Sequence, residues 1–242
     1  MALMTESELL RDIESLTGPD YYPSDEVCEG LGAITLIPIS SPQFGGKTTT
    51  IEAIEGMDPG FRLATSFTTR SRKPGEAPDA YHFVPHNYSV LSTIAGHALL
   101  GNYVQCTVHP NGRVYGSTVD DYHAPYSLLA PVSTEIEKLE KLPFDDIIPI
   151  YLVSHPNDYV RYIRDRVAQT GEIVGQQVLD EGISSLEWAL SRGSRTKWVI
   201  NSYGRQECTA SEIIRIARGG EAQNPAGRKL GELLLDYLCE LS

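Results

Sequence analysis

The sequence AITLIPIS (Ala33–Ser40), followed at once by SPQFGGKT (Ser41–Thr48), decides the fold class of this chain. The first segment is a continuous apolar run, which is typical of a strand buried on both faces of a parallel sheet. The second fits the spacing G-x-x-x-x-G-K-[S/T], except that Ser41 replaces the first glycine. A strand, a glycine-rich loop and a helix N-terminus in this order direct backbone N–H groups at phosphate oxygens. The pattern therefore predicts a phosphate-binding loop, with a helix from about Thr48.

Two side chains of this loop carry chemistry. Lys47 brings a positive charge to phosphate oxygens, and the hydroxyl of Thr48 can reach a Mg²⁺ ion. Ser41 and Phe44 stand where glycine is common, so we expect a stiffer or differently shaped loop. The alternative is an ordinary glycine-capped turn before a helix. The residues expected to bind phosphates are Ser41, Gln43, Gly45, Gly46, Lys47, Thr48 and Thr49.

Further apolar runs and helical patterns alternate along the rest of the chain. Residues 146–154 and 197–200 resemble buried strands, and helical periodicity marks 134–142, 156–168, 176–191 and 207–218. This alternation predicts a three-layer α/β fold with a central parallel sheet. The polar and turn-rich residues 62–125, with a short strand near 80–84, indicate a smaller substrate-binding insertion.

The two ends of the chain lie outside this pattern. A capping box of Thr5 and Glu8 predicts a helix over residues 5–16, and 18–32 resemble a linker, so 1–32 form an N-terminal extension. Residues 219–242 form a C-terminal extension in which a linker leads into an amphipathic helix over 227–241. The N-terminal helix could pack on the core, mediate a dimer or dock a partner.

Composition excludes several classes of protein. The net charge of −12 over 242 residues opposes non-specific attraction to nucleic acid and to anionic membranes. No run approaches the roughly 18 apolar residues of a membrane span, and the acidic N-terminus does not resemble a signal peptide. The four cysteines form no C-x-x-C pair, so free thiols in a cytoplasmic protein are expected.

A second informative segment reads SFTTRSRKPGE (Ser66–Glu76) and is followed by YHFV (Tyr81–Val84). Four of the chain's 20 basic residues (Arg62, Arg70, Arg72 and Lys73) fall within it or just before it. This concentration in an acidic chain indicates an anion-binding site, although an exposed basic turn would also explain it.

The order of these residues resembles the signature of the guanylate kinase family, S-x-T-T-R-x-x-R-x-G-E followed by Y-x-F. Further on, Tyr115-Gly116-Ser117 is similar to the family's Y-G-T, and Trp198–Asn201 to its late strand that ends in asparagine. The resemblance covers about residues 33–218 and marks a divergent member. It implies a P-loop NTPase fold with an acceptor-binding insertion (about 62–125) and a helical lid (about 155–195). It also implies ATP-dependent, Mg²⁺-assisted phosphorylation of a nucleoside monophosphate, most often GMP or dGMP.

The resemblance also assigns roles to individual acceptor residues. Ser66 would contact the acceptor base, and Arg70, Tyr81 and Tyr115 would hold its phosphate, which a guanidinium binds through paired hydrogen bonds. Lys73 stands at the family's second arginine, with Arg72 one place earlier. Ser117 replaces a threonine. The base-reading glutamate has no counterpart, and Gln105 is the nearest candidate, so the resemblance is weakest for guanine.

The lid and the metal site also depart from the family pattern. Arg161, Arg164 and Arg166 stand where lid arginines neutralise the moving phosphoryl group, although a solvated helix face would look similar. Residues 127–132 lack the aspartate that the family places near the metal. The metal would then be held by Thr48, the phosphates and water, or by another acid, for which Asp120, Asp121 and Glu135 are candidates. By resemblance, Asn201 would line the adenine pocket.

Two other classes of function stay open at this point. One is a non-catalytic scaffold whose old acceptor site binds a phosphorylated or acidic partner; the missing acids and the altered lid favour it, whereas the retained Gly46-Lys47-Thr48 does not. The other is a kinase of the same fold that acts on a different phosphorylated small molecule. The sequence leaves the oligomeric state open.

Overall fold

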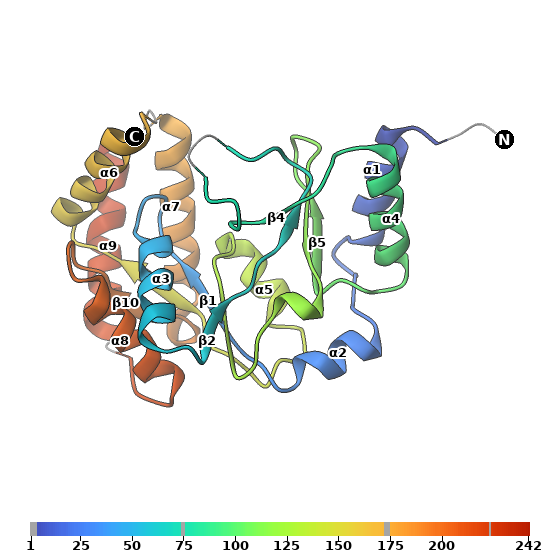
Figure 1. The fold of residues 1–242 in the computed structure, drawn as a ribbon. Coiled ribbons are helices and arrows are strands. Elements are labelled where there is room, and N and C mark those ends of the chain that lie inside the picture. Colours follow the sequence, from blue (N-terminus) through green and yellow to red (C-terminus); the bar gives the residue numbers. More distant parts are fainter. Residues whose placement is uncertain (1–3, 74–75, 172–174, 223) are drawn as a thin grey trace. The chain divides into compact units, whose positions relative to one another are not determined.

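The computed structural model describes residues 4–73, 76–171, 175–222 and 224–242. It divides the chain into two compact units. The large-sheet unit comprises Thr35–Leu63, Ala124–Glu140 and Asp146–Ser242, and the small-sheet unit comprises Met1–Ile34, Ala64–His123 and Lys141–Asp145. Because each unit has its own sheet, the two are described separately (Figure 1).

The large-sheet unit contains a six-stranded sheet in the order β10-β9-β1-β7-β2, with β8 beside β1. Every recorded pair in it is parallel. The strands are β1 (Thr35–Ser40), β2 (Phe61–Leu63), β7 (Tyr126–Leu129), β8 (Asp146–Ile147), β9 (Ile150–Val153) and β10 (Lys197–Ile200). The predicted central parallel sheet is therefore confirmed.

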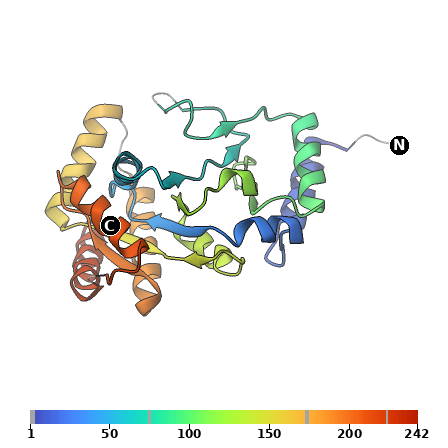
Figure 2. The same cartoon turned by 60° about the horizontal axis from the view of Figure 1, so that its bottom comes forward.

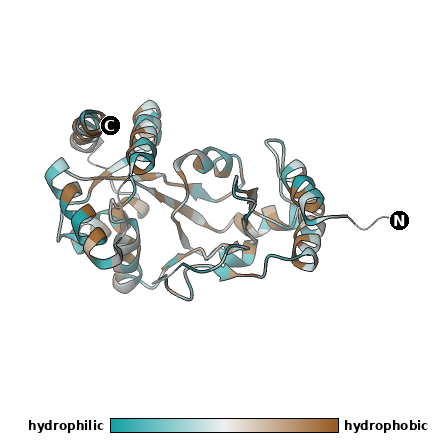
Figure 3. Ribbon diagram, turned by 90° about the horizontal axis from the view of Figure 1, so that it is seen from above, coloured by the Kyte–Doolittle hydropathy of each residue, from teal (hydrophilic) through white to brown (hydrophobic). Residues whose placement is uncertain are grey.

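Helices cover both faces of this sheet because its strands are apolar on both sides. In β9, Ile150 and Leu152 join the core beneath α3 (Lys47–Met57) and α8 (Gln206–Ala217). Tyr151 and Val153, which alternate with them, join the core beneath α6 (Pro156–Thr170), α7 (Gln176–Ser191) and α9 (Asn224–Leu241). α7 and α9 lie side by side (Figures 1 and 2). The result is a three-layer fold, in which brown, apolar segments follow the strands (Figure 3).

The observed elements follow the predictions with local differences. The predicted strand at 146–154 is divided into β8 and β9, between which Pro149 has no N–H for a ladder. The helix expected over 134–142 is shorter, a 3₁₀ turn η2 (Ser133–Glu135) continued by α5 (Ile136–Leu139). A further 3₁₀ turn, η3 (Gly193–Arg195), precedes β10. No helix in the described ranges has the length and apolar character needed to cross a membrane.

The small-sheet unit contains four short strands in the order β4-β3-β6-β5. They are β3 (Phe67–Thr68), β4 (His82–Phe83), β5 (Gln105–Val108) and β6 (Val114–Ser117). The apolar face of this sheet, with Phe67, Cys106 and Val114, packs in one core with α1 (Glu6–Leu16) and α4 (Tyr88–Leu99). The predicted N-terminal helix thus exists, with its Thr5–Glu8 capping box, and belongs to this unit.

Three elements of this unit were not expected from the sequence. α4 lies inside the region that we expected to be turn-rich, and it begins where Asn87 caps the N–H of Val90. α2 (Asp25–Leu31) lies in the expected linker and is capped by Ser24. η1 (Val119–Asp121) is a 3₁₀ turn in which Asp121 caps Thr118. The linker interpretation of residues 18–32 was therefore wrong for α2.

Candidate active site

The predicted phosphate loop joins β1 to α3 in the large-sheet unit. β1 ends at Ser40 and α3 begins at Lys47, with Gly46 as the N-cap residue at φ +83°. Gly46 has no side chain to cap the helix, so the N–H groups of the first turn (Lys47, Thr48 and Thr49) have no side-chain partner within the described part of the chain. A helix start with free N–H groups has a partial positive charge, which suits an anion.

Lys47 lies folded back along this loop. Its Nζ donates to the carbonyl of Ser41 (3.2 Å) and to the Ser41 hydroxyl (3.1 Å). Burial lowers the pKa of Lys47 to about 8, while the charge of Glu181 acts in the opposite direction. Ser41, which replaces a glycine, therefore contributes a hydroxyl that contacts the lysine. An anion beside this ammonium would stabilise its charged form.

Two other residues of the loop are restrained by its shape. Phe44 adopts φ +64°, a left-handed conformation that costs a non-glycine residue roughly 1–2 kcal/mol. At Gly45, an added Cβ would lie 2.6 Å from the Ser41 hydroxyl oxygen, so only glycine fits. The loop therefore has two left-handed residues, Phe44 and Gly46, and the first of them is aromatic, which is how its shape differs from that of a glycine-rich loop.

The remaining predicted loop residues differ in how they are used. Thr48, the predicted Mg²⁺ ligand, is exposed at the helix start. Thr49 donates its hydroxyl to the carbonyl of Gly46 (3.0 Å). Gln43 contributes its backbone carbonyl, which accepts from the hydroxyl of Tyr159 (2.8 Å). Tyr159 had not been singled out from the sequence.

Asn201 is fully buried at the end of β10, and both ends of its amide are engaged. Its Nδ2 donates to the carbonyl of Gly45 (2.9 Å), and its Oδ1 accepts from the hydroxyl of Thr209 (3.0 Å). The residue therefore contacts the phosphate loop directly.

The three arginines predicted to act in a lid (Arg161, Arg164 and Arg166) all lie on α6 and are exposed. Arg161 is 3.9 Å from Asp158, and its guanidinium lies over the ring of Tyr203, 5.6 Å from the centroid. The hydrogen bond from α6 to the loop comes from Tyr159. Arg164 and Arg166 are exposed in the same helix.

In the small-sheet unit, the strand register gathers the predicted acceptor residues on one face. Gln105 pairs with Ser117, and Thr68 pairs with Tyr115. Since side chains alternate between faces and Phe67 lies on the apolar face, these four residues share the opposite face. Ser66 precedes Phe67 and belongs to the same polar face. The sheet thus has one face packed under helices and one face that carries polar groups.

Arg70, Tyr81 and Tyr115 are brought together on this face, as the resemblance implies. The Arg70 guanidinium lies 4.9 Å from the centroid of the Tyr81 ring, and the Tyr81 and Tyr115 rings are 6.0 Å apart. Burial raises the pKa of the Tyr81 hydroxyl, so it stays a neutral donor. A guanidinium with tyrosine hydroxyls nearby offers several hydrogen-bond donors, which suit a phosphate group.

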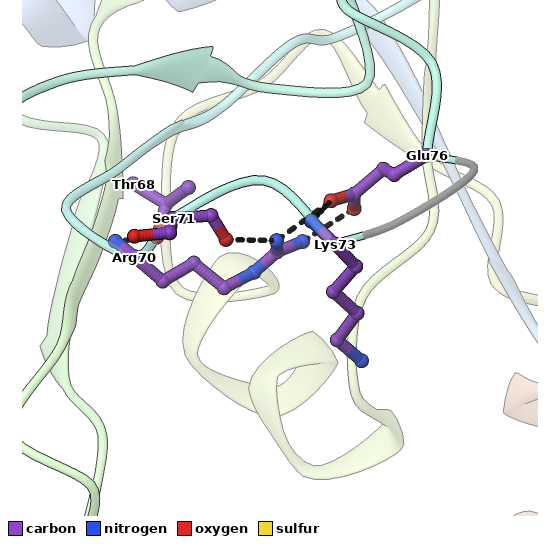
Figure 4. A network of polar contacts seen from close by, with 5 residues as sticks. All are labelled: Thr68, Arg70, Ser71, Lys73 and Glu76. Atoms are coloured by element: carbon purple, nitrogen blue, oxygen red, sulfur yellow. Dashed lines mark hydrogen bonds and ion pairs between the residues drawn. The ribbon is translucent and has the colours of Figure 1, made fainter.

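Glu76 forms an ion pair with Arg70. Its two carboxylate oxygens accept from Arg70 Nη1 (2.7 Å) and Nη2 (2.5 Å), and one of them also accepts from the N–H of Lys73 (2.9 Å; Figure 4). The hydrogen bonds from Arg70 lower the pKa of Glu76 to about 2, and those same bonds raise the pKa of Arg70. Glu76 thus pairs with the guanidinium that the resemblance assigns to an acceptor phosphate. The neighbouring Pro74 and Gly75 lie outside the described residues.

Other predicted acceptor residues have different surroundings. Arg72 and Lys73 are exposed, and the Lys73 side chain extends away from the ion pair in Figure 4. Ser117 is buried, with its hydroxyl 3.0 Å from that of Tyr122. Gln105 is half-buried at the start of β5, and no acidic residue occupies that strand.

Two of the three acids considered for metal binding, Asp121 and Glu135, are engaged elsewhere. Asp121 accepts from the N–H and hydroxyl of Thr118 and lies 3.3 Å from His82, while Glu135 pairs with Lys138. Among the described residues, no three His, Cys, Asp or Glu side chains form a metal-binding group. Mg²⁺ commonly binds through one or two protein groups together with substrate phosphates, and the exposed Thr48 hydroxyl fits that pattern.

Comparisons with known proteins bear on this arrangement. Guanylate kinases of Aromatoleum aromaticum and Thiobacillus denitrificans are each 45% identical, over 51 and 47 residues, but these matches span only about a quarter of the relatives' own length (25% and 22%). That of Syntrophotalea carbinolica is 26% identical over 147 residues, 59% of this chain and 68% of the relative. No protein-family model matches.

The solved structure of guanylate kinase from Anaplasma phagocytophilum has the same fold, with a TM-score of 0.51, 17% identity and coverage of 84% of this chain and 93% of that one. The chain is a divergent relative of the guanylate kinases. In this guanylate kinase relative, the resemblance derived from the Ser66–Glu76 segment and the phosphate loop is confirmed at the level of family and fold.

Proposed function

We propose that the chain transfers a phosphoryl group from ATP to a nucleoside monophosphate, most readily GMP or dGMP, giving ADP and the diphosphate. The observation that carries this proposal is the phosphate loop, where Lys47 lies along an uncapped helix start. The likeness to guanylate kinases adds the reaction and the acceptor class.

The loop residues would hold the ATP phosphates. Lys47 would exchange its contacts with Ser41 for phosphate oxygens, and the N–H groups of the first turn of α3 would bind the same anion. The Thr48 hydroxyl and the phosphates would hold Mg²⁺, which would neutralise phosphate charge. On α6, Arg161, Arg164 and Arg166 would neutralise the moving phosphoryl group.

The polar face of the small sheet would hold the acceptor. Arg70, Tyr81 and Tyr115 would bind its phosphate, with Lys73 or Arg72 adding charge, once Glu76 has moved off the guanidinium. Ser66 and Gln105 would contact the base. Ser117 would hold the end of β6 in place through its hydrogen bond with Tyr122. An amide at Gln105 offers one donor and one acceptor, which pairs with the N1–H and O6 of guanine.

ADP release tests this proposal directly. The purified chain is assayed with MgATP against the nucleoside monophosphates and several sugar phosphates, together with Lys47→Ala and the matched surface variant Lys229→Ala, which removes an exposed lysine on α9. We expect turnover with guanine nucleotides that Lys47→Ala abolishes and Lys229→Ala retains. Unchanged turnover in Lys47→Ala would rule the mechanism out, and a preference for a sugar phosphate would correct the substrate.

The ion pair of Arg70 and Glu76 favours a second candidate. If the pair is permanent, the acceptor site is filled by the chain's own carboxylate, and the fold serves as a non-catalytic scaffold. Calorimetry with MgATP separates the two. A catalyst binds the nucleotide, whereas a scaffold without ATP chemistry shows no heat of binding.

A further inference from the structure

Two side chains from distant parts of the sequence donate hydrogen bonds to carbonyl groups of the phosphate loop. Asn201, at the end of β10, donates to the carbonyl of Gly45, 156 positions earlier in the sequence. Tyr159, on α6, donates to the carbonyl of Gln43, 116 positions earlier. All of these residues belong to the large-sheet unit.

These two bonds determine which way the loop's peptide groups face. In a trans peptide, the C=O of one residue and the N–H of the next point in opposite directions. With the carbonyls of Gln43 and Gly45 turned toward Tyr159 and Asn201, the N–H groups of Phe44 and Gly46 turn away from those side chains. Neither N–H meets an acceptor in the described part of the chain. The two groups are thus presented as free donors.

The orientation of the Asn201 amide follows from its partners. A carbonyl can only accept, so the group facing the Gly45 oxygen must be the NH₂, and the Oδ1 must face the Thr209 hydroxyl. Thr209 is itself buried on α8. Gly46 allows this approach, because a Cβ at that position would lie 2.6 Å from Asn201 Nδ2.

We propose that Asn201 and Tyr159 are positioning residues for ATP: they hold the carbonyls of Gly45 and Gln43 away from the phosphates so that the N–H groups of Gly46 and Phe44 face them, and Thr209 fixes the Asn201 amide. This inference rests on the proposed function for its ligand. It gives Asn201 a role in shaping the loop and brings α6, which carries the lid arginines, into contact with the phosphate site through Tyr159.

Matched pairs of variants test the proposal. Tyr159→Phe removes only the hydroxyl that binds the loop, and Tyr151→Phe removes the hydroxyl of an equally buried tyrosine on β9, which binds Ser185 (3.0 Å) away from the loop. Thr209→Val removes the donor to Asn201 without a change of shape, and Thr209→Ser retains the hydroxyl. MgATP dissociation constants are measured by calorimetry for all four variants and for the native chain.

We expect Tyr159→Phe and Thr209→Val to weaken MgATP binding about 3-fold to 10-fold, the effect of losing one buried hydrogen bond. Tyr151→Phe and Thr209→Ser should bind within about twofold of the native chain. The affinity for GMP should not change in any of them, because the residues that we assign to it lie in the small-sheet unit. Equal MgATP affinities for Tyr159→Phe and Tyr151→Phe would overturn the proposal.

A second measurement needs no ATP. The N–H of Gly45 is bonded to the Pro42 carbonyl, and that of Thr50 to the Gly46 carbonyl, both at 3.0 Å. Hydrogen exchange at these two amides should quicken in Tyr159→Phe and Thr209→Val but not in their controls. If the native chain binds no MgATP while exchange still separates the pairs, the proposed function fails and the positioning of the loop stands. If exchange does not separate them, the positioning proposal is wrong.

Discussion

ATP binding should draw a proton onto Lys47 above about pH 8. Burial against the phosphate loop lowers the pKa of this ammonium from 10.5 to about 8 in the free protein. A triphosphate in the loop would restore the pKa to its ordinary value or higher, because an anion favours the charged form. Bound and free protein then differ in proton content at alkaline pH.

The magnitude follows from the two pKa values. At about pH 9 the free lysine is about one-tenth charged, so binding takes up about 0.9 of a proton, whereas at about pH 7 it takes up only about 0.1. The same difference weakens ATP binding about tenfold between these pH values, or about 1.4 kcal/mol. Lys47→Met should show neither effect.

Calorimetry in two buffers of different ionisation enthalpy measures the proton uptake. The difference between the native chain and Lys47→Met at the same pH removes the contribution of ATP's own phosphates. The reasoning is refuted if that difference is the same at about pH 7 and about pH 9, or if the native affinity is flat over this range.

Folding stability provides an independent check. Because the folded pKa lies below the unfolded value, the folded chain binds fewer protons between about pH 8 and 10.5, and stability rises with pH across that window. Below it, the buried charge costs up to about 3 kcal/mol. Urea unfolding should therefore find Lys47→Met more stable than the native chain at neutral pH and little different above about pH 10.5.

Three further predictions follow from single contacts. Glu76→Gln weakens the ion pair that occupies Arg70 and should lower the KM for the acceptor severalfold in steady-state assays; a higher KM would show that Glu76 supports the site rather than blocking it. Gly46→Ala should destabilise the fold by more than about 2 kcal/mol in urea and abolish ATP binding, since its Cβ meets Asn201, whereas Gly193→Ala, at φ +61° with open space, should cost only about 1 kcal/mol. Arg192→Ala should lower the free energy of unfolding by about 3 kcal/mol in the same assay, because it removes the buried guanidinium that pairs with Glu140. The matched variant Arg195→Ala, at an exposed arginine, should change it by no more than about 0.5 kcal/mol.

The parallel sheet could be predicted because several of its strands carry their own signal. Ala33–Ser40 is a continuous apolar run and Lys197–Ile200 ends in three successive apolar residues, as burial on both faces requires whatever the neighbouring strands are. The three-residue strand β2 is too short to carry such a signal, and it was not predicted. The helices of the large-sheet unit show a 3.6-residue period for the same reason. α4 was missed although Leu91, Ile94 and Ala98 have helical spacing, because the segment lies in a polar, turn-rich region and contains β-branched residues with little helix propensity. Packing of Leu91 and Ile94 into the core with α1 stabilises it instead.

The acceptor site shows the same division. The segments Ser66–Glu76 and Tyr81–Val84 singled out Arg70 and Tyr81 as candidates, since family signatures preserve residue order. The ion pair between Glu76 and Arg70 could not be predicted from any local pattern, because it depends on how the pairing of β3 with β4 brings the two residues together.

By itself the sequence determined the α/β class, the position of the phosphate loop and the likeness to guanylate kinases. It could do so because the strand, the loop and the helix follow one another directly along the chain, so that their pattern can be recognised locally. Only the tertiary structure decided what holds that loop in shape. Asn201 and Tyr159 reach it across 156 and 116 positions, and such partners are set by how helices pack on a sheet rather than by any spacing along the chain.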